Sequence, residues 1–187
     1  MPEADADEAL MVRVAQGDHA ACRQLTERHL GRILAFASRT LGDRAAAEDV
    51  AQEVFMRLWM HAKRWRPGPA RLTTWLHRVA LNLCLDYSAR QREQTLDGVP
   101  EPVDPRGDAA VRMQERDLQN HVAAALRSLP DTQRAAITLC HYQGFRNTEA
   151  AEVLGVSVEA IESLLARGRR TLRDRLRATA PELLRES

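Results

Sequence analysis

The chain has 187 residues, of which 44% are hydrophobic and 28% charged, a composition that suits one or two compact domains rather than a disordered or fibrous protein. Only 4% of the residues are aromatic, and no segment alternates Val, Ile or Thr with polar residues, so we expect an all-α fold. The formal net charge of +1 argues against a protein that coats nucleic acid through charge alone.

Charge is nevertheless distributed unevenly along the chain. The segment Met1–Glu8 contains four acids and no base. Residues 63–92 instead contain seven Lys or Arg residues and a single acid, Asp86. The basic charge is therefore concentrated in one segment.

The N-terminus and the cysteines argue against several other classes of protein. No basic segment followed by an apolar stretch opens the chain, and no apolar run approaches the roughly 20 residues that a membrane span requires. We therefore expect a cytoplasmic protein that does not insert into a membrane by itself. Cys22, Cys84 and Cys140 are odd in number, far apart and outside any CxxC motif. This pattern predicts reduced, mostly buried thiols, with no disulfide framework, no metal site and no cofactor.

Residues 93–109 form a predicted linker. Pro100, Pro102 and Pro105 lie there with two glycines and several acids, and proline at this density prevents a continuous helix. The segments on either side are each long enough for a small helical domain. We therefore predict two helical domains, 1–92 and 110–187, joined flexibly through 93–109.

Apolar periodicity, interrupted by Gly and Pro, predicts the helices of each domain. In the first domain they are Glu8–Gln16, His19–Leu41, Arg44–Ala62 and Thr73–Arg92. In the second domain they are Ala110–Ser128, Asp131–Tyr142, Thr148–Leu154 and Val158–Arg177.

The predicted helix Arg44–Ala62 contains the sequence AEDVAQEVFMRLW and has two contrasting faces. Its broad apolar face is formed by Val50, Val54, Phe55, Leu58 and Trp59. Its other face is formed by Asp49, Gln52, Glu53 and Met56. An acidic stripe of this kind suits docking onto a basic partner protein, although exposed acids can also serve solubility alone. No His joins Asp49 and Glu53 at ligand spacing and no glycine-rich phosphate loop is present, so no catalytic residue is predicted.

The predicted helix Thr73–Arg92 also has two faces. Its apolar face is formed by Leu76, Ala80, Leu83, Cys84 and Tyr87. A second stripe is formed by Trp75, Arg78, Asn82 and Asp86. An aromatic ring, a cation and an amide together suit an unpaired DNA strand, because the ring stacks on a base, the amide reads a base edge and the cation holds phosphate. The alternative is that Trp75 belongs to the core.

The stretch from Asn147 to Leu176 has the pattern of a helix-turn-helix. Ala151, Gly155 and Ile161 supply the small residue, the left-handed turn residue and the branched residue that two steeply crossing helices require, and Ser157 is a suitable N-cap. The face expected to enter the major groove consists of Glu159, Glu162, Ser163, Ala166 and Arg170. The arginines between 167 and 177 suit phosphate contact. The alternative is an ordinary helical hairpin with solvated charges.

Three motifs in this order resemble the sigma-70 superfamily, specifically the extracytoplasmic-function group of bacterial subunits that direct RNA polymerase to promoters. AEDVAQEVFMRLW resembles the family's helix for the clamp helices of the polymerase β′ subunit, and TTWLHRVALNLCLDYSARQR resembles its −10 element helix. LRSLPDTQRAAITL followed by EAAEVLGVSVEAIESLLARGRRTLRDRL resembles its −35 reading domain. The resemblance covers residues 10–176.

The resemblance implies three sets of binding residues. Polymerase would contact Asp49, Gln52, Glu53 and Met56. The −10 element would contact Arg71, Trp75, Arg78, Asn82, Asp86 and Arg90, with residues 66–74 capturing a flipped base. The −35 element would contact Asn147, Thr148, Ser157, Glu159, Ala160, Glu162, Ser163, Arg167 and Arg170. The implied partners are core polymerase, through its β′ and β subunits, promoter DNA and an anti-sigma factor.

The sequence also departs from the family's pattern. Glu162 and Leu164 stand where many relatives carry a basic residue, and Glu162 could accept a hydrogen bond from cytosine N4, which would alter the −35 preference.

Two other functions remain as alternatives. A stand-alone helix-turn-helix regulator would bind duplex DNA as a dimer, but no dimerisation heptad is evident. A helical hydrolase or metal enzyme would use Asp49, Glu53 and His61, but would need a pocket that the sequence does not reveal.

Overall fold

The computed structural model describes residues 3–66, 71–95 and 110–179, and no strand occurs in these ranges. The N-terminal bundle consists of α1 (Glu3–Ala15), α2 (His19–Leu41), α3 (Arg44–His61), the 3-10 turn η1 (Ala62–Arg64) and α4 (Leu72–Thr95). The C-terminal bundle consists of α5 (Ala110–Arg127), α6 (Asp131–Ile137), the π-helical turn η2 (Thr138–Tyr142), α7 (Asn147–Leu154) and α8 (Val158–Thr179). The all-α prediction is confirmed.

The predicted helix boundaries agree closely with the observed ones, with two exceptions. Helix α1 begins at Glu3 rather than Glu8. Acidic residues are in general favourable in the first turn of a helix because of the helix dipole. The predicted helix Asp131–Tyr142 is divided, because its last five residues form the wider turn η2. Residues 96–109, most of the predicted linker, lie outside the described residues.

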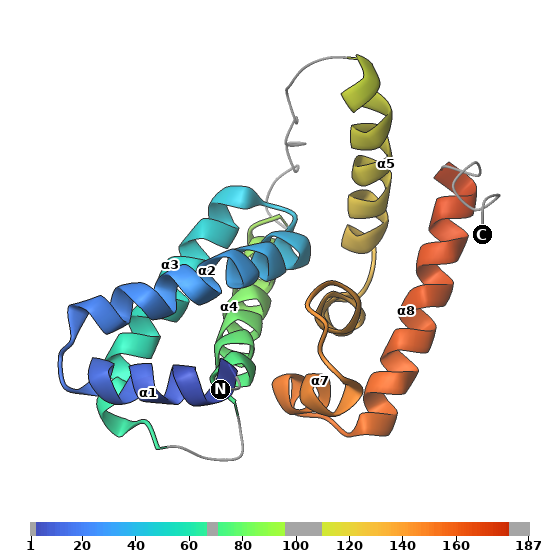
Figure 1. Cartoon of the computed structure of the whole chain (residues 1–187). Coiled ribbons are helices and arrows are strands. Elements are labelled where there is room, and N and C mark those ends of the chain that lie inside the picture. The colour runs from blue at the N-terminus through green and yellow to red at the C-terminus, as the bar shows by residue number, and fades with distance from the viewer. Residues whose placement is uncertain (1–2, 67–70, 96–109, 180–187) are drawn as a thin grey trace.

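In the N-terminal bundle, α2 packs across α3 and α4 while α1 lies against α2 (Figure 1). Two aspartates cap the helices: Asp18 accepts hydrogen bonds from the first turn of α2, and Asp43 accepts one from Ala46 of α3. Gly42 ends α2 with a φ of 71°. The fully buried side chains at the centre include Leu25, Ile33, Phe36, Leu58 and Leu76.

A buried ion cluster attaches α1 to α2. The Asp7 carboxylate lies 2.8 Å from Nε2 of His29 and accepts a hydrogen bond of 2.5 Å from Arg28. Burial alone would raise the pKa of Asp7, but the hydrogen bonds and charges of His29 and Arg28 outweigh burial and lower this pKa below its ordinary value. The pairing was not predicted, because nothing in the local pattern links residues that are 22 positions apart.

In the C-terminal bundle, α7 and α8 form the predicted helix-turn-helix. Gly155 occupies the left-handed region with a φ of 69°, and Ala151 and Ile161 are both buried. Helix α8 also approaches α6 closely, because a Cβ atom on Gly168 would lie 2.6 Å from Cδ1 of Ile137. The predicted roles of Ala151, Gly155 and Ile161 in the turn are confirmed.

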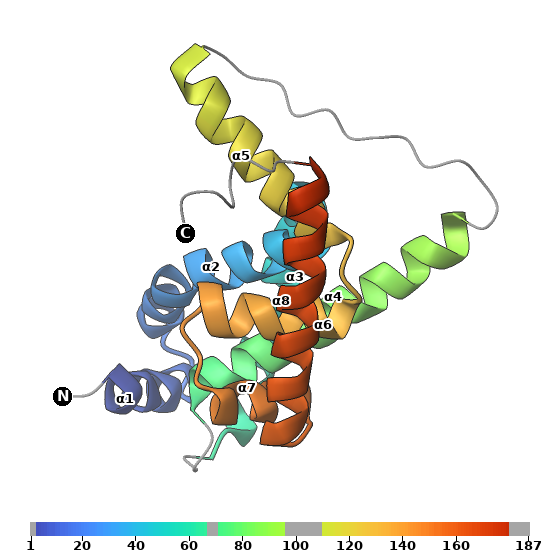
Figure 2. The same cartoon turned by 90° about the vertical axis from the view of Figure 1, so that its right-hand side faces the viewer.

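The two bundles lie against each other. Helix α4 contacts α7, and α2 contacts η2 (Figures 1 and 2). Figure 2 looks onto α8, which crosses α6 and α7 on the side of the C-terminal bundle that faces away from the N-terminal bundle. None of the described helices combines the length and the apolarity that crossing a membrane requires.

Substituting Gly155 by Ala tests the left-handed turn. Alanine pays about 1–2 kcal/mol in this conformation, so G155A should lower the free energy of unfolding by about that amount in a chemical denaturation experiment. The matched control is G31A, because Gly31 lies in the middle of α2 with open space around it. There the same change should raise stability by about 0.5–1 kcal/mol. Equal effects at the two positions would contradict the assignment of the turn.

Candidate nucleic-acid interface

Helix α3 presents the predicted acidic stripe to solvent. Asp49, Gln52 and Met56 are exposed, and Glu53 is half-buried with Oε1 accepting a 2.7 Å hydrogen bond from Arg57 one turn later. The opposite face enters the core through Val50, Val54 and Leu58. The stripe is therefore mounted on a helix that packing holds in place.

Trp59 corrects one part of the prediction for α3. It was placed on the buried apolar face, but it is 45% exposed and lines a shallow hollow with Cys22 and Thr26 of α2. At 100° per residue, Trp59 lies a full 100° beyond Leu58, at the margin of the apolar face rather than at its centre. Periodicity alone does not show how far around the helix the neighbours reach.

Helix α4 carries the predicted polar stripe. Arg78, Asn82 and Asp86 are exposed, as are Arg71 before the helix and Arg90 near its end. On the opposite face Leu76, Ala80 and Cys84 are buried, whereas Leu83 and Tyr87 are half-buried. The two faces are therefore arranged as the periodicity predicts.

Trp75 lies between the two alternatives that the sequence left open. It is half-buried, and its ring stacks on the ring of His61 with a centroid distance of 5.4 Å and an interplanar angle of 16°. Trp65 contacts the Trp75 ring edge-on, with a distance of 6.3 Å between the ring centroids. Trp75 thus belongs to an aromatic cluster at the surface rather than to the centre of the core. His61, a residue of the alternative enzyme hypothesis, is engaged in this cluster.

The start of α8 presents the predicted outward face. Glu159, Glu162, Ser163, Ala166 and Arg170 are exposed, as is Arg167. Ser157 caps the helix, because its hydroxyl accepts a 3.2 Å hydrogen bond from the amide of Ala160, which is half-buried. The pKa of Glu159 is lowered by hydrogen bonds from its own backbone amide and from Ser157. An anionic carboxylate at this position is thus stabilised by the helix N-terminus.

Two further candidates lie at the start of α7. Thr148 is exposed, whereas Asn147 is half-buried and its side-chain oxygen lies 3.8 Å from Sγ of Cys140. The first turn of α7 is capped by Glu149, whose Oε2 accepts a 2.9 Å hydrogen bond from the amide of Arg146. Asn147 therefore faces partly inward and is less available than the other residues of its set.

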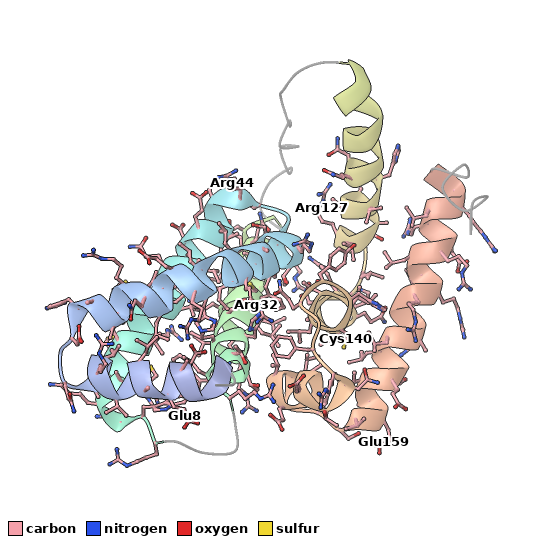
Figure 3. All side chains as sticks on the ribbon, in the orientation of Figure 1. Glu8, Arg32, Arg44, Arg127, Cys140 and Glu159 are labelled. Carbon is pink, nitrogen blue, oxygen red and sulfur yellow. The ribbon has the colours of Figure 1, made fainter. Side chains whose placement is uncertain are left out.

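A few candidate residues from each bundle line one groove of about 680 Å³. Thr74, Trp75 and Arg78 line it from α4, and the opposite wall comes from α7 and the turn, including Thr148, Gly155 and Ser157. Figure 3 shows side chains filling the space between the bundles, with the labelled Arg32 of α2 directed into it. The structure thus places Trp75 and Arg78 of the predicted −10 set opposite Thr148 and Ser157 of the predicted −35 set. The other members of both sets do not line this groove, and neither does the acidic stripe of α3.

His77 and Phe145 form an apolar contact between the bundles that sequence reasoning missed. Their rings meet edge-on at 4.7 Å, and His77 is 1% exposed. The Nδ1 atom of His77 lies 2.8 Å from the carbonyl oxygen of Thr73, to which it donates in the neutral tautomer. Burial is the main cause that lowers the pKa of His77 to about 4, and the charges of Arg32 and His29 act in the same direction. In the sequence, the position of His77 next to the apolar Leu76 was the feature that could have indicated its burial.

The three cysteines are free thiols. Cys84 is buried, and burial raises its pKa to about 12. Burial also raises the pKa values of Cys22 and Cys140, which are half-buried. All three thiols are therefore protonated at neutral pH and react slowly. Within the described ranges, no three His, Cys, Asp or Glu side chains are grouped so that they could hold a metal ion.

Comparison with known proteins identifies the family. The model of Sigma-70 region 2 matches residues 25–94, and the model of Sigma-70 region 4 matches residues 120–172. RNA polymerase sigma factor NccH of Alcaligenes xylosoxydans xylosoxydans is 35% identical over 179 residues, which cover 92% of this chain and 95% of NccH. The chain belongs to the sigma-70 family. The region 2 match falls on α2–α4, and the region 4 match runs from α5 into α8.

Further similarities place this sigma factor in the extracytoplasmic-function (ECF) group. ECF RNA polymerase sigma factor SigE of Mycolicibacterium smegmatis is 36% identical over 169 residues, which cover 87% of this chain but only 65% of SigE. The solved structure of the sigma factor RpoE in complex with the anti-sigma factor NepR from Bartonella quintana superposes with a TM-score of 0.66 at 29% identity, covering 83% of this chain and 96% of RpoE. The protein is therefore an RNA polymerase sigma factor, and the fold agrees with that assignment.

The buried imidazole of His77 predicts a specific pH dependence. The unfolded chain binds a proton at this ring below about pH 6.5, whereas the folded protein excludes it until about pH 4. The contribution of neutral His77 is therefore complete above pH 6.5 and is lost as the pH falls to 4, a change of about 3 kcal/mol in the free energy of unfolding. Asp7, whose pKa is lowered, acts below this window.

Two measurements check this prediction. Denaturant unfolding of the wild type at several pH values should show the decline, and H77Q should show a smaller one. The NMR titration of the His77 ring gives its pKa directly. A ring that titrates near 6.5 in the folded protein would contradict the buried, neutral state.

Proposed function

We propose that this sigma factor docks on core RNA polymerase through α3, binds the unpaired −10 strand along α4 and reads the −35 duplex with the start of α8. The observation that carries the proposal is that each of these helices buries one face in its own bundle and leaves most of its candidate residues exposed. The functional domains would be 1–92 and 110–187, joined through 93–109. The assignments rest on family membership together with this exposure.

Docking on polymerase is assigned to the stripe of Asp49, Gln52, Glu53 and Met56. The stripe combines three polar residues with the exposed apolar side chain of Met56, which suits the centre of a protein interface of modest size. The charged residues would steer the approach of the partner protein, and Met56 would be buried on binding. A partner of this stripe would carry basic groups. The clamp helices of the polymerase β′ subunit are the proposed partner, with further contacts to the β subunit.

Binding of the −10 strand is assigned to α4. Asn82 can read the edge of an unpaired base, while Arg71, Arg78 and Arg90 supply phosphate contacts. Trp75 has one ring face covered by His61, so it can offer only its remaining surface to a base or sugar. Asp86 completes the proposed set. Residues 66–74 would capture a flipped base, although 67–70 lie outside the described residues.

Reading of the −35 element is assigned to α7 and α8. The groove-facing residues begin with Ser157 and continue through Glu159, Glu162 and Ser163, and the arginines that follow would hold phosphate. Glu162 is exposed and accepts hydrogen bonds only, so cytosine N4 is the donor it would select in the major groove. The other members of the set are Asn147, Thr148, Ala160, Arg167 and Arg170.

The polymerase would supply all of the chemistry. We propose that this protein is not an enzyme, needs no cofactor and acts in the cytoplasm as a promoter-specificity subunit. Two modest DNA-binding surfaces joined through polymerase act at a high effective concentration, so the assembled complex can be specific although each surface binds weakly. Control by an anti-sigma factor is also proposed, because RpoE has been solved with one.

The docking assignment predicts the effect of removing two carboxylates. The double variant Asp49→Ala and Glu53→Ala should weaken binding to core polymerase by at least about tenfold, which corresponds to about 1.4 kcal/mol, when titrated by fluorescence anisotropy. The matched control is Glu48→Ala on the same helix, whose exposed carboxylate pairs with Arg44 one turn earlier. An effect of equal size at Glu48 would show that general charge, not the stripe, determines binding.

The experiment that tests the function is in vitro transcription with core polymerase on a library of promoters. Start sites that depend on the added chain are expected, and their absence would overturn the proposal. Sequencing of the selected promoters then tests Glu162, because E162Q should replace a cytosine preference by adenine at one −35 position. A change of about 5- to 150-fold between the two bases is expected, from about 1–3 kcal/mol per contact. The control E152Q, on the exposed side of α7, should leave the preference unchanged.

A further inference from the structure

The last two turns of α3 carry an exposed apolar face. Met56, Trp59 and Met60 are three and four residues apart, so they share one side of the helix. Their exposed fractions are 42%, 45% and 69%, and Met60 is the most exposed of the large hydrophobic side chains that the structure describes. Apolar side chains gathered on one exposed face are typical of a surface that a partner covers.

This apolar face is continuous with the stripe proposed to dock on core polymerase. Met56 is a member of that stripe and lies one turn after Gln52 on the same side of α3. Met60 lies a further turn along the helix, beyond the proposed docking set. A partner centred on the stripe would therefore bury the side chain of Met56 and would reach Met60 only at its margin.

The two exposed methionines differ from Met11, the third methionine whose side chain the structure describes. Met11 is 0% exposed and packs in the core of the N-terminal bundle. A methionine thioether is converted to a sulfoxide when an oxidant reaches its sulfur atom. An oxidant in solution can therefore reach Met56 and Met60, whereas Met11 is shielded as long as the protein stays folded.

The cysteines are poor competitors for such an oxidant. Thiols react rapidly only as thiolates, and burial raises the pKa of Cys22, Cys84 and Cys140. Cys22 lines the hollow beside Trp59, and the charge of Asp18 raises the pKa of this thiol further. A thioether has no proton to lose, so its reactivity depends on exposure instead. The exposed methionines are therefore the sulfur sites of the described residues that an oxidant attacks most readily.

We propose that Met56 is a reversible oxidation site whose sulfoxide weakens docking on core polymerase, an inference that rests on the docking function proposed for α3. Hydrogen peroxide, or another peroxide, is the oxidant. In the reaction its O–O bond breaks, an S–O bond forms on the thioether, and water leaves. The sulfur atom loses two electrons and the peroxide gains them. Methionine sulfoxide reductases remove the oxygen again at the expense of a thiol reductant.

Oxidation changes the docking stripe at one point. A thioether is apolar and favours burial, whereas a sulfoxide carries an oxygen that accepts hydrogen bonds and loses its water when a partner covers it. Asp49 and Glu53 of the same stripe carry ionised carboxylates, which accept hydrogen bonds and cannot donate one to the sulfoxide. The sulfoxide is neutral, so the charge that steers the encounter is unchanged. Oxidation should therefore act mainly by raising the rate at which the complex dissociates.

The test oxidises the full-length protein alone with hydrogen peroxide, removes the peroxide with catalase, and then titrates the protein with core polymerase by fluorescence anisotropy. Oxidation should weaken binding at least about tenfold, and treatment with methionine sulfoxide reductases and a thiol should restore the original affinity. Peptide mass spectrometry should find one added oxygen on Met56 and on Met60 but none on Met11. Circular dichroism checks that the helices stay intact.

Two matched variants assign the effect to one sulfur atom. Met56→Leu removes the thioether and keeps an apolar side chain of similar volume, and Met60→Leu makes the same change at the neighbouring exposed position. Each variant is compared with its own unoxidised sample, so any effect of the substitution itself on affinity cancels. M56L should lose the sensitivity to peroxide, whereas M60L should keep it.

Several results would overturn the proposal. Peroxide that leaves Met56 unmodified in the folded protein is one of them, and oxidation of Met56 without loss of affinity is another. Protection by M60L in place of M56L, or a loss that the reductases do not reverse, also overturns it. If the untreated chain does not bind core polymerase, the docking function fails together with this inference, whereas binding that peroxide leaves unchanged contradicts the inference alone.

Discussion

Helix α4 has neighbours on several sides, and this constraint determines how both bundles are used. Leu76, Ala80 and Cys84 enter the core of the N-terminal bundle, where α2 and α3 pack against them. The same helix contacts α7, so the surface left to solvent in its middle turns is a stripe that includes Asn82 and Asp86, while residues 89–94 near its end are all exposed. A ligand of α4 can therefore use this stripe and the exposed end of the helix without displacing α7.

Much of the fold could be predicted from the sequence because its determinants are local. The break at Gly155 follows from left-handed backbone, which glycine adopts at little cost, and the cap at Ser157 follows from free amides at a helix start. The buried stripe of α8 follows from the helical spacing of its apolar residues. The π-helical turn η2 was not predictable, because it extends a helical pattern without changing the residue types that define it.

The candidate site could be predicted in part, and for a similar reason. The exposed residues of α3, α4 and α8 were assigned correctly to outward faces, since a helical period fixes which residues share a face. Trp59 was misplaced because its burial depends on how far α2 reaches around α3. The pairing of Arg32 with Gln143 joins residues 111 positions apart, and no local pattern connects them. The relation between the two bundles could therefore not be inferred from periodicity.

Arg134 shows how the second bundle completes the first. It is 8% exposed, and one guanidinium nitrogen donates a 2.5 Å hydrogen bond to the carbonyl oxygen of Thr40 in the last turn of α2, while another donates to the carbonyl oxygen of Leu129. Terminal carbonyls of a helix have no partner within the helix, so this contact supplies one from another part of the chain. The end of α2 and the start of α6 thus form one cooperative unit, which couples the local unfolding of either bundle to the other.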